Sequence, residues 1–494
     1  MKSLGLPFSL SPCRLGCLLL FALTMQATAA DWHQWRGPNR NGVAANSPKL
    51  IDALPAKGMK PLWISDAKLL PAARSGGWSS PIISGKNLYL YTHKRFRTSK
   101  GKIPKRKFPY LAPEKRKGMS PKQYAEYEKK RRTEDEQRAK NFRHDETVYC
   151  LDRNTGNVVW THTNTTVYSR FSQSGSPAIA DGRLIVLGAG RVAYCLNAKT
   201  GKKLWDRRLP GTFRDEHLPS SFVVANDRAV VLADDLFALD TATGKIIWTV
   251  KAKSKGRCFS SPTVWIHNQQ AFAISNMAGG VTVCVAVKDG KEMWSVRSLA
   301  GHSSPLVVGD KLITYGSSRK RGLRCYDLSP TRAKLAWTNR RLKDPGSSPV
   351  VLGNFVFVQG ERRLSCVDLN SGKSRWTTML DLNRPQYTSL IAADNKVFYA
   401  CDNILCFKAT PTKFESLMNA KIDETGLMAG VKAFRELLKI DELETTAEGQ
   451  RKAERIWRKK FGRNAPLPCS SPAFADGKIY IRLRSGIACY DLRR

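Results

Sequence analysis

The stretch Asp152-Arg153-Asn154-Thr155-Gly156-Asn157-Val158-Val159-Trp160 decides the fold, because related forms of it return along most of the chain. Each copy begins at a serine, continues through short apolar runs, reaches an Asp or Asn before a turn, and ends on an aromatic strand. The Trp residues that end successive copies are Trp160, Trp205, Trp248, Trp294, Trp337 and Trp376. This spacing of roughly 40 residues is the period of a four-stranded propeller blade.

The number of copies predicts an all-β ring of eight blades. The serines that open the first strand of each copy are Ser80, Ser176, Ser221, Ser261, Ser304, Ser348, Ser389 and Ser471. The apolar runs are rich in β-branched and aromatic residues, which are typical of strands. Blade five replaces the glycine turn with Ser329-Pro330-Thr331, and the seventh copy has no Trp after Cys406. We expect Phe414 to take the place of that Trp.

The two ends of the chain complement one another. The last copy stops at Asp491, before a fourth strand, while Lys60-Pro61-Leu62-Trp63 precedes the first copy without strands of its own. We therefore predict that the N-terminal segment supplies the outer strand of blade eight. Such a closure removes the open edges of a ring.

Residues 1–30 have the pattern of a secretory signal peptide. Basic residues Lys2 and Arg14 flank the start, an apolar run extends from Leu15 to Met25, and small residues precede Asp31. The apolar run is too short to span a bilayer. The sequence predicts export to the periplasm or the extracellular space, a mature propeller over 31–494, and no transmembrane segment in the mature chain.

The chain has 12 cysteines, and most of them occupy one structural position. The cysteines predicted at the same place in the third strand are Cys150, Cys195, Cys284, Cys325, Cys366, Cys406 and Cys489. We interpret them as small buried fillers between blades rather than disulfide partners. A pairing of Cys401 with Cys406 across a hairpin stays open. Without a Cys-x-x-Cys motif or a His cluster, no metal site is predicted.

The protein is strongly basic, with 82 Lys and Arg residues against 41 acids and a formal net charge of +41. A basic insertion at about 97–145 concentrates this charge. Such a surface attracts polyanions, and anionic polysaccharide, outer-membrane lipid or an acidic cofactor would all fit. A solvated face without a partner is the alternative. Nucleic acid is not expected, because the chain has no recognisable nucleic-acid-binding module and is predicted to be exported.

Two insertions are predicted to be helical. In the first, Ser120-Pro121-Lys122-Gln123 is a good helix start, with Ser as the cap and Gln returning to it. The second, at about 425–463, has apolar residues at helical spacing. Both should leave the ring on one face, so the helices could meet as a lid over the centre. The alternative is that each helix packs on its own blade.

The repeat Asp152–Trp160 resembles that of pyrroloquinoline quinone (PQQ) propellers, as do Asp240–Trp248 and Asp368–Trp376. The segment Asp31–Pro38 resembles the mature start of secreted PQQ-like repeat proteins of planctomycete-type bacteria. The resemblance implies an eight-bladed, quinoprotein-like ring outside the cytoplasm. In quinoprotein alcohol dehydrogenases of this family, PQQ binds near the axis with calcium, a carboxylate base and adjacent cysteines. This chain has no adjacent cysteine pair.

Ligand-binding residues are expected in the loops that lead into the first strands, where they would line the central funnel. Converging arginines suit a polycarboxylate such as PQQ, and an indole can stack on a planar ring. Asp215, Glu216 or Asp344 could act as a base or bind calcium. The candidate cofactor-binding residues are Trp78, Arg170, Arg214, Arg257, His302 and Arg384. The alternative for each of them is an ordinary loop contact.

Three functional hypotheses follow. The first is an exported, monomeric binding or docking scaffold that meets envelope proteins or anionic polymers. The second is a PQQ-dependent dehydrogenase of alcohols or sugars, which would need an axial site that no motif identifies. The third is a binder of polyanions or carbohydrates. One fold can carry any of these functions, so the site must decide between them.

Overall fold

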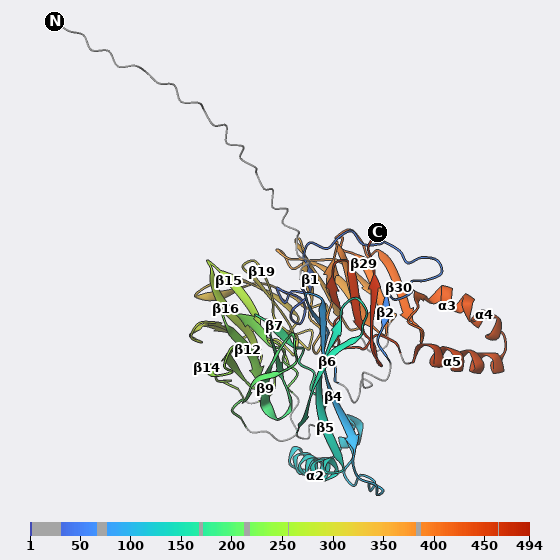
Figure 1. Cartoon of the computed structure of the whole chain (residues 1–494), viewed down its shortest axis with the longest axis horizontal. Coiled ribbons are helices and arrows are strands. Elements are labelled where there is room, and N and C mark those ends of the chain that lie inside the picture. The colour runs from blue at the N-terminus through green and yellow to red at the C-terminus, as the bar shows by residue number, and fades with distance from the viewer. Residues whose placement is uncertain are drawn as a thin grey trace.

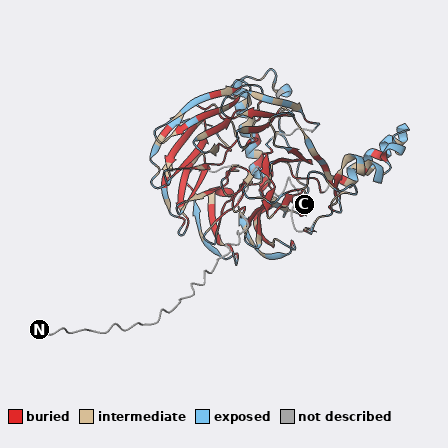
Figure 2. Cartoon of the chain, turned by 90° about the horizontal axis from the view of Figure 1, so that it is seen from above, coloured by how far each residue is buried: buried red, intermediate tan, exposed pale blue. Residues whose placement is uncertain are grey.

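The computed structural model describes Met1 and residues 31–66, 77–166, 171–211, 218–254, 256–381, 387–462 and 464–494. Eight sheets, antiparallel except where β1 (Val43–Ala44) joins blade seven, stand around a common axis, which confirms the predicted eight-bladed propeller (Figures 1 and 2). The proposed signal peptide lies outside the described residues, apart from Met1. In the described part of the chain, no helix is long and apolar enough to cross a membrane.

Blades one to six each consist of four strands in chain order. The sheet of blade seven has six strands, because β1 and β31 (Met428–Gly430) flank its own four, and blade eight has three strands of its own and β2 (Trp63–Ile64) from the N-terminal segment. Blade one contains β3 (Ile82–Ser84), β4 (Asn87–Arg97), β5 (Phe142–Asp152) and β6 (Val158–Thr166), and blade two contains β7 (Ala178–Ala180), β8 (Arg183–Leu187), β9 (Val192–Asn197) and β10 (Lys203–Arg208). Blade three contains β11 (Val223–Ala225), β12 (Arg228–Ala233), β13 (Asp235–Asp240) and β14 (Ile246–Val250). Blade four contains β15 (Thr263–His267), β16 (Gln270–Met277), β17 (Val281–Ala286) and β18 (Glu292–Val296). Blade five contains β19 (Leu306–Val308), β20 (Lys311–Tyr315), β21 (Leu323–Ser329) and β22 (Arg332–Asn339), and blade six contains β23 (Val350–Leu352), β24 (Phe355–Gly360), β25 (Arg363–Asp368) and β26 (Ser374–Met379). Blade seven contains β27 (Ile391–Ala393), β28 (Lys396–Cys401), β29 (Asn403–Lys408) and β30 (Ser416–Ile422). Blade eight contains β32 (Ala473–Ala475), β33 (Lys478–Arg482) and β34 (Ile487–Asp491).

The repeated Trp and Gly explain how one blade docks on the next. The Trp160 indole lies against Gly201 of blade two, where an added Cβ would come within 2.6 Å of the ring. Its Nε1–H donates to Ala198 O at 3.2 Å. Gly201 also has a φ of 71°, which favours glycine. Blade five lacks this glycine turn, and Trp294 Nε1 of the preceding blade has no partner among the described residues.

The N-terminal segment closes the ring as predicted. Strand β2 (Trp63–Ile64) pairs antiparallel with β34, with Trp63 opposite Cys489. The Trp63 indole then packs on Gly156 of blade one and donates to Arg153 O at 2.9 Å. Blade eight therefore docks on blade one through the same contact that joins the other blades.

A belt of serines links the blades around the axis. We call the eight serines that open the first strands the belt. In seven links the backbone N–H of one belt serine donates to the Oγ of the belt serine in the next blade. The link Ser471 N to Ser80 Oγ, at 2.8 Å, joins blades eight and one. Between blades seven and eight the link is missing among the described residues, because nothing there bonds Ser471 Oγ. The repeated serine therefore satisfies backbone donors that would otherwise be buried without a partner.

Residues 31–44, here called the axial plug, lie inside the ring. The carbonyls of Trp32 and His33 accept from Ile83 N and Ile179 N of blades one and two, each at 2.9 Å. Arg40 Nη1 donates to Phe222 O of blade three at 2.7 Å. Strand β1 (Val43–Ala44) adds to β27 of blade seven in parallel (Figure 1). The plug thus contacts the first strands, or the residues just before them, of blades on opposite sides of the ring.

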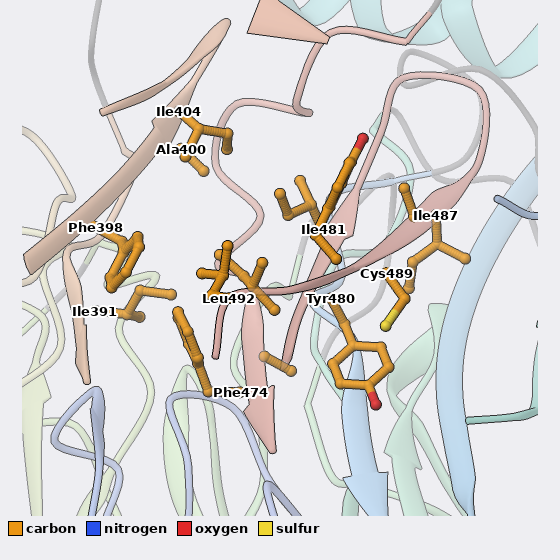
Figure 3. Packing of buried hydrophobic residues seen from close by; sticks show 14 of the residues in the cluster. Ile391, Phe398, Ala400, Ile404, Phe474, Tyr480, Ile481, Ile487, Cys489 and Leu492 are labelled. Atoms are coloured by element: carbon orange, nitrogen blue, oxygen red, sulfur yellow. The ribbon is translucent and has the colours of Figure 1, made fainter. Parts of the chain in front are cut away.

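Apolar side chains fill the spaces between neighbouring blades. Figure 3 shows Phe398 of blade seven and Phe474 of blade eight side by side, with ring centroids 4.9 Å apart. The seven third-strand cysteines are fully buried, and the described cysteines form no disulfide. Cys406 pairs with Phe398, three positions before Cys401, so Cys401 and Cys406 are about 10 Å apart along the strand and cannot bridge.

The seventh blade differs from the sequence prediction at the position of the missing Trp. Cys406 lies opposite Met418, where Cys150 lies opposite Trp160 in blade one. Met418 therefore takes the Trp position, and the prediction for Phe414 was wrong. Phe414 instead packs on Trp376 of blade six, with ring centroids 5.7 Å apart.

The two insertions stand apart. The first carries η1 (Pro113–Arg116) and α2 (Pro121–Ala139), and both bonds of the predicted Ser120 and Gln123 capping box are present. The second carries β31 (Met428–Gly430), α3 (Val431–Leu437), α4 (Ile440–Leu443) and α5 (Ala447–Phe461). Helix α2 lies below one end of the ring, whereas α3–α5 project from its side (Figures 1 and 2). The hypothesis of a lid built from both insertions was therefore wrong.

Candidate functional site

An axial cavity of about 690 Å³ lies beside the belt, and each blade contributes one wall residue to it. The wall residue stands two positions before the belt serine, because the chain passes the axis there before it enters the first strand. The eight wall residues, from blade one to blade eight, are Trp78, Ser174, Pro219, Phe259, His302, Gly346, Tyr387 and Cys469. A different side chain at this wall position alters the lining of the cavity, while the belt serine two residues later stays the same.

The floor and the mouth of the cavity come from outside the repeat. Trp35 of the axial plug lines the cavity, and we call this residue its floor. The Arg40 guanidinium lies 5.3 Å from the centre of the Trp35 ring and supports it from the plug side. Arg132 of α2 and Arg257 also line the cavity. Helix α2 therefore contributes a residue to the cavity from outside the repeat.

The cavity exposes aromatic surface that a folded protein normally covers. The side chains of Phe171 and Tyr387 are 49% and 45% exposed, and both line the cavity. Tyr387 and Cys469 have left-handed φ values of 62° and 72°, which are uncommon for residues other than glycine. Strained backbone and open aromatic surface together are typical of a binding site.

Three of the six predicted cofactor-binding residues lie together at this cavity. Trp78, Arg257 and His302 all line it. Arg170, Arg214 and Arg384 lie outside the described residues, as do Asp215 and Glu216. Their binding role stays a prediction, but the expected place, in loops that lead into the first strands, is where the cavity lies.

Asp344 lies behind the wall rather than in it. Its Oδ1 accepts from Gly346 N at 2.8 Å and Ser347 N at 2.6 Å, while no described residue bonds its Oδ2. Burial raises the pKa of this carboxyl above its usual value. Burial also raises the pKa of the Cys469 thiol to about 12, which keeps the thiol protonated at neutral pH.

The chemistry of the lining suits an anionic aromatic group better than a calcium ion. Among the described lining residues, the charged side chains are those of Arg132 and Arg257, and no carboxylate is present. No cluster of metal-ligating side chains was found in the described part of the chain. Calcium takes oxygen ligands, mainly carboxylates. Arginine forks and aromatic rings would instead hold the carboxylates and the flat rings of a quinone such as PQQ.

Trp35, Arg132, Phe259 and Tyr387 were missed as site residues from the sequence. A signal for Phe259 and Tyr387 was present, since both stand two residues before a belt serine, as Trp78 does. No comparable signal exists for Trp35 or Arg132. They reach the cavity through the plug and the insertion, which lie outside the repeat.

Comparisons with known proteins agree with this architecture. A family model described as outer membrane protein assembly factor BamB matches residues 144–378. The quinoprotein alcohol dehydrogenase PedH of Pseudomonas putida is 25% identical over 198 residues, which cover 37% of this chain and 31% of that relative. A quinoprotein ethanol dehydrogenase of Pseudomonas aeruginosa is 28% identical over 164 residues, covering 29% of this chain and 26% of the relative. The chain is a β-propeller whose residues 144–378 are similar to the PQQ-repeat family.

Solved structures show the same fold at low sequence identity. The europium-containing methanol dehydrogenase has a TM-score of 0.53 and 11% identity, covering 79% of this chain and 85% of that one. The quinohemoprotein alcohol dehydrogenase of Comamonas testosteroni has a TM-score of 0.51 and 11% identity, covering 79% of this chain and 73% of that one. The matches to the curated dehydrogenases cover less than a third of those relatives' length. The propeller fold is therefore shared, while activity is a separate question.

Proposed function

We propose that this propeller is an exported binding module that holds a flat, anionic aromatic ligand of the PQQ class in its axial cavity. The observation that carries the proposal is the cavity itself, which has an aromatic floor at Trp35, aromatic walls and two arginines. Its volume of about 690 Å³ lies within the usual range for a small-molecule site.

The arrangement supports stacking and charge pairing at the same time. A planar ligand between Trp35 and the wall aromatics would bury both of its faces. Offset or edge contacts between aromatic rings contribute about 0.5–1.5 kcal/mol each beyond the area that they bury. Arg257 and Arg132 would pair with carboxylates at the edge of the ligand, since guanidinium and carboxylate form bidentate bonds.

A PQQ-dependent dehydrogenase is the second candidate, because the relatives matched in sequence carry that activity in their names. The buried carboxyl of Asp344, which accepts from the backbone N–H groups of the wall residues Gly346 and Tyr387, is the group that favours it here. Binding without turnover is better supported, because the described lining offers no carboxylate as a base or calcium ligand. PQQ, if bound, would supply a quinone that accepts two electrons and two protons.

The basic insertion, whose Arg132 lines the cavity, supports a second role for the protein as a docking surface. Its acids are largely used within the insertion, since Arg131 pairs with Glu128 and Asp135, and Glu134 accepts from two backbone amides. Many lysines, among them Lys129 and Lys130, appear in no ion pair between described residues. This surplus supports docking of an envelope protein or an anionic polymer beside the cavity mouth.

A titration with PQQ tests the proposal. Isothermal titration calorimetry of the purified chain, with and without calcium, should show binding at micromolar concentration or below in both cases. A dye-linked assay with ethanol and glucose should show no turnover above a heat-denatured control. No binding of PQQ would contradict the proposal, and calcium-dependent turnover would favour the dehydrogenase instead.

A further inference from the structure

His302, the wall residue of blade five, is held in one orientation by blade four. The backbone N–H of Phe259 donates to His302 Nδ1 at 3.2 Å. The two rings also stack, with centroids 4.7 Å apart and planes 33° apart. The imidazole therefore has a fixed position in the cavity wall rather than a free rotamer.

The bond to Nδ1 follows from the fold. In blade one the N–H of the wall residue Trp78 donates in the same way to the next wall side chain, Ser174 Oγ, at 3.3 Å. A backbone N–H can only donate, so the atom that receives it must be an acceptor. In a neutral imidazole the other nitrogen then carries the proton. The propeller backbone thus selects the tautomer with a proton on Nε2.

The surroundings of His302 also favour the neutral ring. Burial, together with the positive charge of Arg321, lowers the pKa of this imidazole below its usual value. A proton on Nδ1 would in addition face the Phe259 N–H, donor against donor. At neutral pH the ring consequently offers one hydrogen-bond donor, Nε2–H, without a formal charge.

We propose that His302 Nε2–H is a specificity-determining donor that binds a carbonyl oxygen of the ligand, while the arginines bind its carboxylates. This inference rests on the proposed function and narrows its ligand class. A neutral donor suits an uncharged acceptor, whereas carboxylates pair more strongly with guanidinium. The ligand is therefore a planar aromatic acid that also carries a ring carbonyl, placed at the edge that faces blades four and five.

Two substitutions of His302 distinguish the contribution of its Nε2–H donor from that of its aromatic ring. His302→Gln keeps an acceptor for the Phe259 N–H and a donor for the ligand, so the affinity for PQQ should fall by no more than about 3-fold. His302→Phe keeps the stacking surface and removes the donor, so the affinity should fall about 10-fold, the effect of one hydrogen bond of ordinary strength. His267→Gln is the matched control, because His267 bonds Asp310 outside the cavity lining.

Nuclear magnetic resonance tests the tautomer without any ligand. Long-range proton–nitrogen spectra of protein labelled with ¹⁵N-histidine should show protonated Nε2 and bare Nδ1 for His302, assigned by the signal that is missing in His302→Gln. A protonated Nδ1 would overturn the inference, as would equal PQQ affinity of His302→Phe and the wild type. If the wild type does not bind PQQ, the proposed function and this inference both fail. The spectra then still show whether the His302 tautomer itself was predicted correctly.

Discussion

The axial plug and the axial cavity meet at Trp35, and both contain tryptophan and arginine. In the plug, Arg36 and Arg40 are fully buried and donate to backbone carbonyls of blades three, six and seven. Burial lowers the pKa of each guanidinium to about 9. In the cavity, Arg132 and Arg257 line open space. The same residue types therefore bind backbone carbonyls in the plug and line the wall of the cavity.

Removal of residues 31–65 should have the largest effect, because this segment contains both the plug and the closing strand β2. The ring would lose the pairing of β2 with β34 and the contact of Trp63 with Gly156. We expect loss of cooperative thermal unfolding or a fall in stability of more than about 5 kcal/mol, of the order of a domain's whole stability. Circular dichroism melting measures it, with the chain that begins at Asp31 as the control. An unchanged melting curve would contradict the closure.

A single substitution in the plug, Arg36→Ala, should come next. Arg36 donates to Asn41 O at 3.2 Å, to Leu390 O at 3.3 Å and to Pro349 O. Its loss leaves buried carbonyls without a donor, and we expect a cost of about 2–4 kcal/mol in urea unfolding. Arg332→Ala, at an exposed position of β22, is the control and should stay within about 0.5 kcal/mol. Equal effects of the two substitutions would mean that the plug does not stabilise the ring.

The difference between plug and cavity also explains how much could be predicted from the sequence. The blades, their number and the closing strand could be predicted, because the serine, the turn glycine and the Trp each make the same contact in successive blades. Wall residues such as Trp78 and His302 could be found because they precede a belt serine. Trp35 could not, because the plug occurs once and meets the blades through contacts that are distant in sequence. The prediction of a lid was wrong for a related reason, because the direction in which each inserted helix leaves the ring depends on local packing that no repeat encodes.

On the cavity side, Trp35→Ala should reduce ligand binding much more than stability. The Trp35 ring is partly exposed and forms the floor, so its removal should lower PQQ affinity about 10-fold or more, as expected for a stacking aromatic anchor. Calorimetry is the suitable measurement, because it does not depend on tryptophan fluorescence. Trp457→Ala on α5 removes a tryptophan away from the cavity and should leave the affinity unchanged. Similar losses in both variants would place the ligand elsewhere or reveal a general loss of fold.

The serine belt, most of whose members line the cavity, allows the finest test. Ser348 Oγ accepts from Ser304 N at 3.1 Å, and Ser348 does not line the cavity. Ser348→Ala should therefore cost about 1 kcal/mol of stability, because it leaves one buried donor unpaired, and should not change PQQ affinity. Ser471 provides the matched control, since no described residue bonds its buried Oγ, while its backbone N–H still donates to Ser80 Oγ. Ser471→Ala should change the free energy of unfolding by no more than a few tenths of a kcal/mol. If both variants lost the same stability, serine volume rather than the hydrogen-bonded belt would hold the blades together.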